Sequence, residues 1–390
     1  MDKKLFTPGP LTTSKTVKEA MLRDLGSRDF EFIETVKYIR TELLKIAGVS
    51  RLDGFESIIM QGSGTFGIEA VISSIIPSGG HLLVLVNGAY GDRIAKIAVI
   101  HSISVSFIRT EENTFPNPSQ LDDMLCSDPT ITHVASVHCE TTTGILNPIE
   151  EYANVCNKYN KTFIVDAMSS FGAIPIDMKA NKIDVLISSS NKCIEGAPGF
   201  SVIIIKRDIL ETIENKPRTL SLDLCAQWKG LEADGQFRFT PPTHILLAFK
   251  QALIELSDEG GVAGRAERYS DNHKTLSKGM ISLGFKEYVD KLNQSYIITS
   301  FLYPDHPNFD FAKFYSLLNE RDCVIYPGKL SKQNCFRIGN IGRIYKEDIK
   351  NLLENIKIVL EEMNVSLSIR FPKNNSNTLL GGISSFILNL

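Results

Sequence analysis

The sequence predicts an α/β protein with a mostly parallel seven-stranded sheet, followed by a smaller α+β domain. Short apolar runs of strand length recur through residues 15–255, and stretches of helical periodicity separate most of them. Strands that read as nearly continuous apolar runs are buried on both faces, which is typical of a parallel sheet covered by helices. The pattern then changes near residue 260, which indicates the second domain.

Seven apolar runs are the expected strands of the large sheet. In chain order they are 57–60, 81–86, 103–108, 132–137, 162–166, 184–188 and 200–205. Helical patterns between them include 66–76 and 90–100. In sheets of this kind a ligand binds outside the carboxyl ends of the strands. Polar residues that directly follow these runs are therefore candidates for a functional site.

The last third of the chain predicts a separate, smaller unit. A long helix is expected at 260–283, followed by strand and helix patterns at 295–303, 311–321, 323–327, 335–339 and 346–363. We therefore expect a large domain over 1–258, with an N-terminal arm at 1–15, and a small domain over 259–365. The apolar tail at 366–390 is too short to span a membrane, and packing on the protein itself or on a partner is its simplest interpretation.

Composition argues against several classes of function. The formal net charge is −3 and no dense run of Lys or Arg occurs, so neither nucleic acid nor an anionic membrane is favoured as a partner. Seven cysteines lack CxxC spacing, which argues against a metal site or a disulfide framework. The first residues lack the apolar core of a signal peptide. These features fit a soluble globular protein of the reducing cytosol.

Small residues follow the first strand. Gly62, Ser63, Gly64 and Thr65 come after Met60 and open the next helix. Small residues let backbone N–H groups approach an anion, and the helix N-terminus adds partial positive charge. The segment is either a phosphate cradle or an ordinary capped turn. Its spacing matches neither the Walker pattern nor a dinucleotide fingerprint.

Other polar residues follow later strands. Asp166 ends a buried strand, where an acid is costly unless it is paired, so it either caps the next helix or holds a cation. Lys192 follows the next strand on a turn of small residues. A desolvated lysine has a lowered pKa and can act as a nucleophilic amine. Thr142 and Thr143, in ETTTGILNP, follow another strand, although they are also consistent with turn chemistry alone.

Together these groups match the needs of pyridoxal phosphate. The cofactor requires a cradle for its phosphate, an amine that binds its aldehyde and a carboxylate that pairs with its pyridinium nitrogen. In this interpretation Lys192 would also move a proton between the amine-bearing carbon of the substrate and the cofactor.

Longer stretches of the chain resemble class V aminotransferases, which are fold-type I pyridoxal-phosphate enzymes. The stretches that carry the resemblance are TPGPLTTSKTVKEAML, GSGTFGIEA, NGAYGDR, ETTTGILNP, VDAMSSFGAIPID, SSSNKCIEGAPGF, SLDL, FRFTPPTH and FRIGNIG. They extend from about residue 5 to about residue 363. Within the family, SNKCIEGAPGF with SLDL and YPGK resembles the transaminases that act on 2-aminoethylphosphonate and pyruvate. The resemblance therefore implies these two compounds as substrates.

The resemblance also implies roles for individual residues. Lys192 is expected to bind the cofactor covalently, and Asp166 to pair with its ring nitrogen. Arg337 is expected to bind the acidic group of the substrate, since a planar guanidinium suits a carboxylate or a phosphonate. The remaining cofactor residues are expected to be Ser63, Gly64 and Thr65 at the phosphate, Tyr90 stacked on the ring, Thr142 near the ring hydroxyl and Thr240, given to the phosphate by the neighbouring subunit of a homodimer.

Other interpretations stay open. Another class V transaminase, with alanine–glyoxylate or serine–pyruvate activity, would share the cofactor residues. A cysteine desulfurase is less consistent, because Asn191 precedes Lys192 where those enzymes place a histidine, and Cys323 and Cys335 lie in apolar strand patterns. A non-catalytic protein on this fold would not need the lysine. Arg28 is a further candidate at the mouth of the site.

Overall fold

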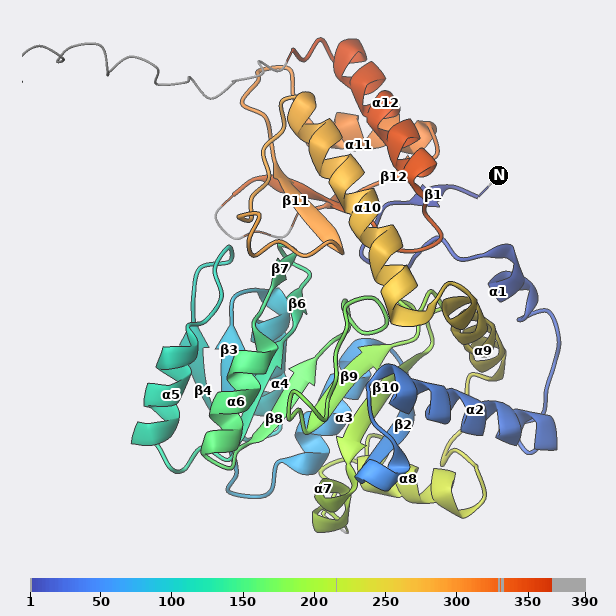
Figure 1. The fold of residues 1–390 in the computed structure, drawn as a ribbon, viewed down its shortest axis with the longest axis vertical. Coiled ribbons are helices and arrows are strands. Elements are labelled where there is room, and N and C mark those ends of the chain that lie inside the picture. The colour runs from blue at the N-terminus through green and yellow to red at the C-terminus, as the bar shows by residue number, and fades with distance from the viewer. Residues whose placement is uncertain (1, 215, 329, 331–332, 367–390) are drawn as a thin grey trace, which may run out of the picture.

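The computed structural model describes residues 2–214, 216–328, 330 and 333–366. The tail expected at 366–390 therefore lies outside the described residues, apart from Ser366. Figure 1 shows a large sheet with its helices, and beside one end of that sheet a smaller group of helices and strands from the last third of the chain.

Seven strands form the central sheet, in the order β2-β10-β9-β8-β5-β3-β4. β10 runs antiparallel to β2 and β9, while all other neighbours are parallel. The predicted α/β class and mostly parallel seven-stranded sheet are confirmed. The strands are β2 Phe55–Gln61, β3 His81–Val86, β4 Ser104–Arg109, β5 His133–Val137, β8 Thr162–Asp166, β9 Val185–Ser189 and β10 Phe200–Lys206.

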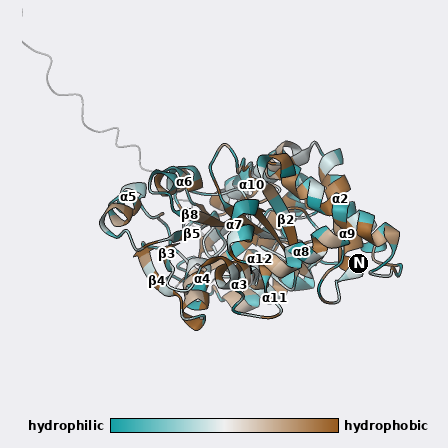
Figure 2. Ribbon diagram, turned by 90° about the horizontal axis from the view of Figure 1, so that it is seen from below, coloured by the Kyte–Doolittle hydropathy of each residue, from teal (hydrophilic) through white to brown (hydrophobic). Residues whose placement is uncertain are grey.

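Helices pack on both faces of this sheet, because most of its strands are apolar on both sides. Figure 2 shows α2 and α6 on one side of the strands and α3 and α4 on the other. Gly67 lets α3 approach β10, since a Cβ there would lie 2.5 Å from Ser201 Oγ. The elements of this part are α1 Lys15–Glu19, α2 Phe30–Ile46, α3 Gly64–Ile75, α4 Ala89–Ile100, α5 Pro118–Ser127, β6 Cys139–Glu140, β7 Ile145–Leu146, α6 Ile149–Lys158, α7 Arg207–Thr212, α8 Leu224–Ala233 and α9 Thr243–Asp258.

The last third of the chain forms its own sheet and its own apolar cluster. Strands β11, β14 and β13 pair in that order, both pairs antiparallel. Rings of Phe285, Phe301, Phe314 and Phe336 pack together at its centre. The elements are α10 Gly261–Ser282, β11 Ile298–Leu302, α11 Phe311–Glu320, β12 Cys323–Val324, β13 Tyr326–Pro327, β14 Cys335–Gly339 and α12 Lys346–Glu362.

Gly260, between α9 and α10, and Gly261, the first residue of α10, both adopt the left-handed region, with φ of 95° and 69°. We propose the boundary between the large and small domains here, at 258/259. The N-terminal arm at 1–15 was expected as part of the large domain. Its first described residues instead contact the C-terminal elements. β1 (Lys4–Leu5) pairs with β12, and Phe6 is buried among the apolar residues of the C-terminal elements.

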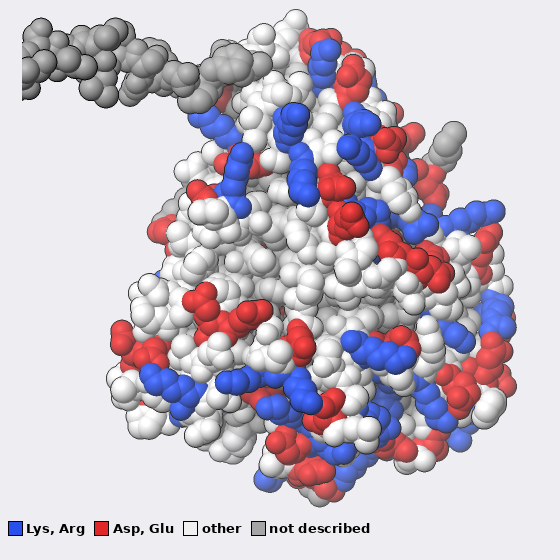
Figure 3. Space-filling view, in the orientation of Figure 1, with Lys and Arg blue, Asp and Glu red and all other residues white. Residues whose placement is uncertain are grey.

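Charged residues of both signs are interspersed over the face that Figure 3 shows, in line with the small net charge. Among the described residues, no helix is both long and apolar enough to cross a membrane.

Candidate active site

A cavity of about 170 Å³ lies at the carboxyl ends of β2, β8 and β9. This is where an α/β sheet of this kind places its ligand. Its walls bring together six of the nine predicted site residues, which are Ser63, Gly64, Thr65, Tyr90, Asp166 and Lys192.

The cradle, Ser63-Gly64-Thr65, forms the start of α3. Ser63 is the N-cap residue, and its hydroxyl makes no hydrogen bond to the helix. Arg93 donates a hydrogen bond of 3.1 Å to Thr65 Oγ1. Gly64 packs closely on Met168, since a Cβ there would lie 2.5 Å from Met168 Sδ and would force that side chain to move. Free backbone N–H groups, an uncommitted hydroxyl and a nearby cation make this an anion site.

Asp166 ends β8 and is only 4% exposed. The Met168 N–H donates to its Oδ1 at 3.0 Å. Burial raises the pKa of Asp166 to about 7, while the positive charges of Arg93 and Lys192 act in the opposite direction. Among the described residues it has no ion-pair partner. A buried carboxyl without a bonded cation suits a ligand that carries an N–H⁺ group.

Lys192 is half-buried three residues after β9. Desolvation lowers the pKa of its amine to about 8. Lys192 Nζ donates a hydrogen bond to the carbonyl of Pro8. Gly9 adopts φ of 117°, and a Cβ there would lie 2.8 Å from Lys192 Nζ. The N-terminal arm therefore packs closely on the lysine, and a glycine is required at this contact.

Arg337 lies in β14 and is fully buried. Its Nη1 donates to Thr141 O at 2.6 Å, and its Nε and Nη2 donate to Pro327 O at 3.1 and 2.9 Å. No acidic side chain of the described residues pairs with it. It lies outside the cavity wall, yet its charge acts on both Tyr90 and Lys192. A buried guanidinium without an acidic partner suits an anionic ligand.

Thr142 and Thr240 also lie outside the cavity wall. The buried hydroxyl of Thr142 donates to Glu140 Oε1 and accepts from the Ala89 N–H, 3.1 Å away. It therefore fixes the turn that precedes Tyr90. Thr240 is exposed, and its carbonyl accepts a 3.4 Å hydrogen bond from Gln61.

Two charged residues of the site were not singled out from the sequence. Arg93 lines the cavity, with its guanidinium 4.8 Å from the centre of the Tyr90 ring. Arg93 follows Tyr90 by three residues in a helical pattern, which places both side chains on one face of a helix. This spacing could have indicated Arg93 from the sequence. Glu140 is fully buried and accepts from the N–H groups of Thr142 (3.1 Å) and Gly91 (3.4 Å). Arg28 is exposed and is not part of the cavity wall.

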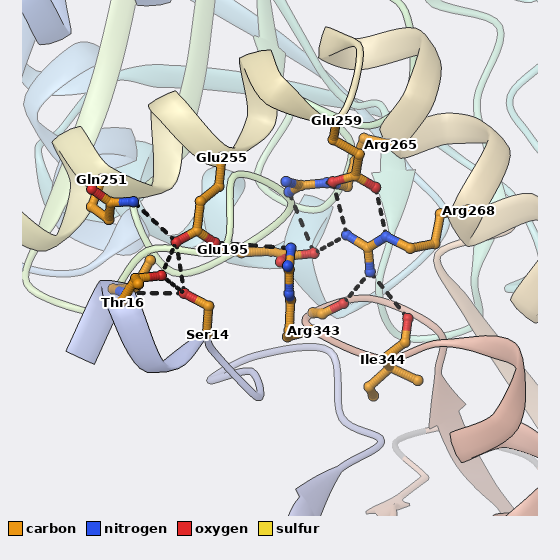
Figure 4. A network of polar contacts seen from close by, with 12 residues as sticks. Ser14, Thr16, Glu195, Gln251, Glu255, Glu259, Arg265, Arg268, Arg343 and Ile344 are labelled. Atoms are coloured by element: carbon orange, nitrogen blue, oxygen red, sulfur yellow. Dashed lines mark hydrogen bonds and ion pairs between the residues drawn. The ribbon is translucent and has the colours of Figure 1, made fainter. Parts of the chain in front are cut away.

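Figure 4 shows a cluster of charged side chains around Glu195, which follows Lys192 by three residues. Glu195, 3% exposed, pairs with Arg268 at 2.6 Å and with Arg265 at 3.4 Å. Glu259 pairs with the same two arginines at 2.6 and 2.7 Å. Tyr269 donates to Glu195 Oε1 at 2.6 Å.

This cluster contacts both the turn that carries Lys192 and the segment that follows Arg337. Arg265 donates to the carbonyl of Cys193, the residue after the lysine. Arg268 donates to Gly342 O and Ile344 O, which follow the strand that carries Arg337. The ionic cluster therefore joins the lysine turn to the segment after β14.

Comparison with known proteins defines the class. The family model for class V aminotransferases matches residues 13–344. The chain belongs to this family, as its motifs predict. It is 51% identical over 355 residues to the 2-aminoethylphosphonate–pyruvate transaminase of Vibrio vulnificus (strain CMCP6), covering 90% of this chain and 96% of that relative. It is 50% identical over 353 residues to the transaminase of the same name from Bacillus cereus (strain G9842), covering 90% and 96%.

Solved structures confirm the fold. The ureidoglycine–glyoxylate aminotransferase of Bacillus subtilis has a TM-score of 0.86 at 22% identity, covering 94% of this chain and 95% of that one.

Pyridoxal phosphate is the cofactor of this class, and the cavity suits it. The cradle offers hydrogen-bond donors to a phosphate, and Asp166 offers a buried carboxyl to a ring N–H. Lys192 offers an amine whose lowered pKa favours reaction with an aldehyde.

Proposed function

We propose that this protein transfers the amino group of 2-aminoethylphosphonate to pyruvate, which gives phosphonoacetaldehyde and L-alanine. The observation that carries the proposal is Arg337, a buried cation that pairs with no acidic side chain in the described part of the chain and lies close to a cavity that holds Lys192 and Asp166. Both substrates have an acidic group for this arginine. The names of relatives that are about half identical over 90% of the chain support this pair of substrates.

Each residue of the site has its own role in the proposed amino-group transfer. Bound pyridoxal phosphate supplies an aldehyde that takes up the amino group and a ring that draws electrons from the neighbouring carbon. Asp166 keeps the ring nitrogen protonated. Lys192 Nζ removes a proton from the amine-bearing carbon of the donor, and in the second half it delivers a proton to the carbon that becomes Cα of alanine. Arg337 binds the phosphonate and then the carboxylate. The cradle and Arg93 hold the phosphate.

The remaining cofactor contacts belong to the same proposal. Tyr90 stacks on the ring, and Thr142 lies close to the ring hydroxyl. The protein is a cytoplasmic homodimer in which Thr240 of the partner subunit completes the phosphate site. Two exposed aromatic rings support a subunit contact at this place. Phe66, next to Thr65, is 51% exposed, and Phe239, next to Thr240, is 46% exposed.

Product analysis tests the proposal. Purified protein with pyridoxal phosphate is incubated with 2-aminoethylphosphonate and pyruvate, and both products are measured. Equal amounts of phosphonoacetaldehyde and L-alanine are expected, and none with Lys192→Ala. Absence of L-alanine, or full activity of Lys192→Ala, would contradict the proposal.

A further inference from the structure

Arg337 offers a limited number of donors to its ligand. A guanidinium has five N–H bonds. Three are committed to the carbonyls of Thr141 and Pro327. The two that remain, one on each terminal nitrogen, match the two oxygens of a carboxylate such as that of pyruvate. A phosphonate has three oxygens, so the third needs a donor from another residue.

Tyr326 is placed to be that donor. It is paired directly with Arg337 across β13 and β14, so the two side chains share one face of the sheet. The guanidinium carbon lies 4.9 Å from the centre of the Tyr326 ring. Tyr326 is half-buried, and its hydroxyl has no hydrogen-bond partner among the described residues. A phenol next to the cation, with its proton uncommitted, is suited to an anionic oxygen.

Tyr90 is the other phenol close to Arg337. Its ring, however, lies in the wall of the cofactor cavity next to Arg93. Tyr326 lies outside that wall and contacts the arginine itself, so it is the better candidate for the substrate's acidic group.

We propose that Tyr326 determines specificity, because its hydroxyl donates to the third phosphonate oxygen while the two free N–H bonds of Arg337 bind the other two. The inference rests on the proposed function. A carboxylate substrate has no third oxygen and gains nothing from this hydroxyl. The enzyme therefore favours the phosphonate over a carboxylate donor of equal length.

The test compares Tyr326→Phe with the wild-type holoenzyme. The substitution keeps the ring on Arg337 and removes only the hydroxyl. kcat and KM are measured for 2-aminoethylphosphonate, for 3-aminopropanoate, which differs only in its acidic group, and for pyruvate. We expect kcat/KM for the phosphonate to fall about tenfold or more, as for a lost hydrogen bond to a charged group. The values for both carboxylates should change less than about twofold.

Tyr303→Phe is the matched control. Its ring packs on Phe336, whose side chain points to the opposite face of β14 from Arg337, and it should leave all three values unchanged. An unchanged phosphonate value in Tyr326→Phe, or an equal loss for the phosphonate and the carboxylates, would overturn the inference. Wild-type protein that does not use 2-aminoethylphosphonate would instead overturn the proposed function, and the inference with it.

Discussion

At the residue scale, the carboxyl of Asp166 receives little stabilisation from the protein itself and is suited to pair with a bound ligand. Its carboxyl is buried and receives one backbone hydrogen bond, and burial raises its pKa to about 7. The folded protein without cofactor therefore holds this proton more tightly than the unfolded chain does. The stabilisation is complete below pH 4 and is lost as pH rises through 7. Above pH 7, folding must bury a charged carboxylate.

Asp166→Asn should consequently make the cofactor-free protein more stable at pH 8. An amide keeps the bond from Met168 and carries no charge, so we expect a gain of about 1–3 kcal/mol that disappears near pH 4. The same change should lower transaminase activity by about 100-fold or more, since the ring nitrogen loses its anionic partner. Urea denaturation at both pH values and the product assay measure the two effects. A stability loss at pH 8, or unimpaired activity, would contradict this role.

The sequence predicted that several polar residues at strand ends would lie together, and they line one cavity, while their roles toward a cofactor stay predictions. Asp166, Lys192 and the cradle meet because parallel strands end at one edge of the sheet. Sequence could not indicate that Pro8 accepts a hydrogen bond from Lys192, because this contact depends on the path of the N-terminal arm. Likewise, the proximity of Tyr326 to Arg337 depends on strand register.

At the element scale, the ionic cluster holds the lysine turn against α10. Glu195 has a backbone φ of 66°, which is unusual for a residue with a side chain, and its carboxylate contacts Arg265, Arg268 and Tyr269. Because these groups are buried or nearly buried, removal of the Glu195 charge leaves Arg265 and Arg268 to share the single carboxylate of Glu259.

Glu195→Gln should therefore destabilise the protein by about 3 kcal/mol or more. Glu34→Gln is the control, because Glu34 pairs with Lys37 on the exposed face of α2, where the expected loss is under about 1 kcal/mol. Urea midpoints at constant m-value measure the difference. Equal losses in the two variants would show that the cluster has no special role in stability.

Most strands of the large sheet were predicted to within one residue at each end, and β2 to within two, whereas short strands were not. The run at 323–327 was expected as one strand. It divides into β12, which pairs with β1, and β13, which pairs with β14. Alternation of apolar residues cannot indicate such a change of partner, because it reports burial and not pairing.

At the scale of the whole molecule, each active site of the proposed dimer contains residues from both chains. Lys192 and Thr240 of the partner subunit would then belong to one site. A mixed dimer of Lys192→Ala and Thr240→Val chains would contain one fully intact site and one doubly altered site.

Co-expression of the two variants should therefore restore activity. We expect clearly more activity than the sum of the two purified variants, approaching half the wild-type value per mixed dimer. Differently tagged chains allow the mixed dimer to be isolated and assayed. If mixing gives no gain although mixed dimers form, Thr240 does not act across the subunits.

The measurement that tests the proposed function most directly is an absorbance titration of the protein loaded with pyridoxal phosphate. 2-Aminoethylphosphonate, L-alanine, L-serine and glycine are added separately. The proposed function predicts that 2-aminoethylphosphonate changes the absorbance of the bound cofactor at far lower concentration than serine or glycine, and that pyruvate reverses the change. A lower effective concentration for serine or glycine would contradict the phosphonate assignment while leaving the class V fold and its cofactor site intact.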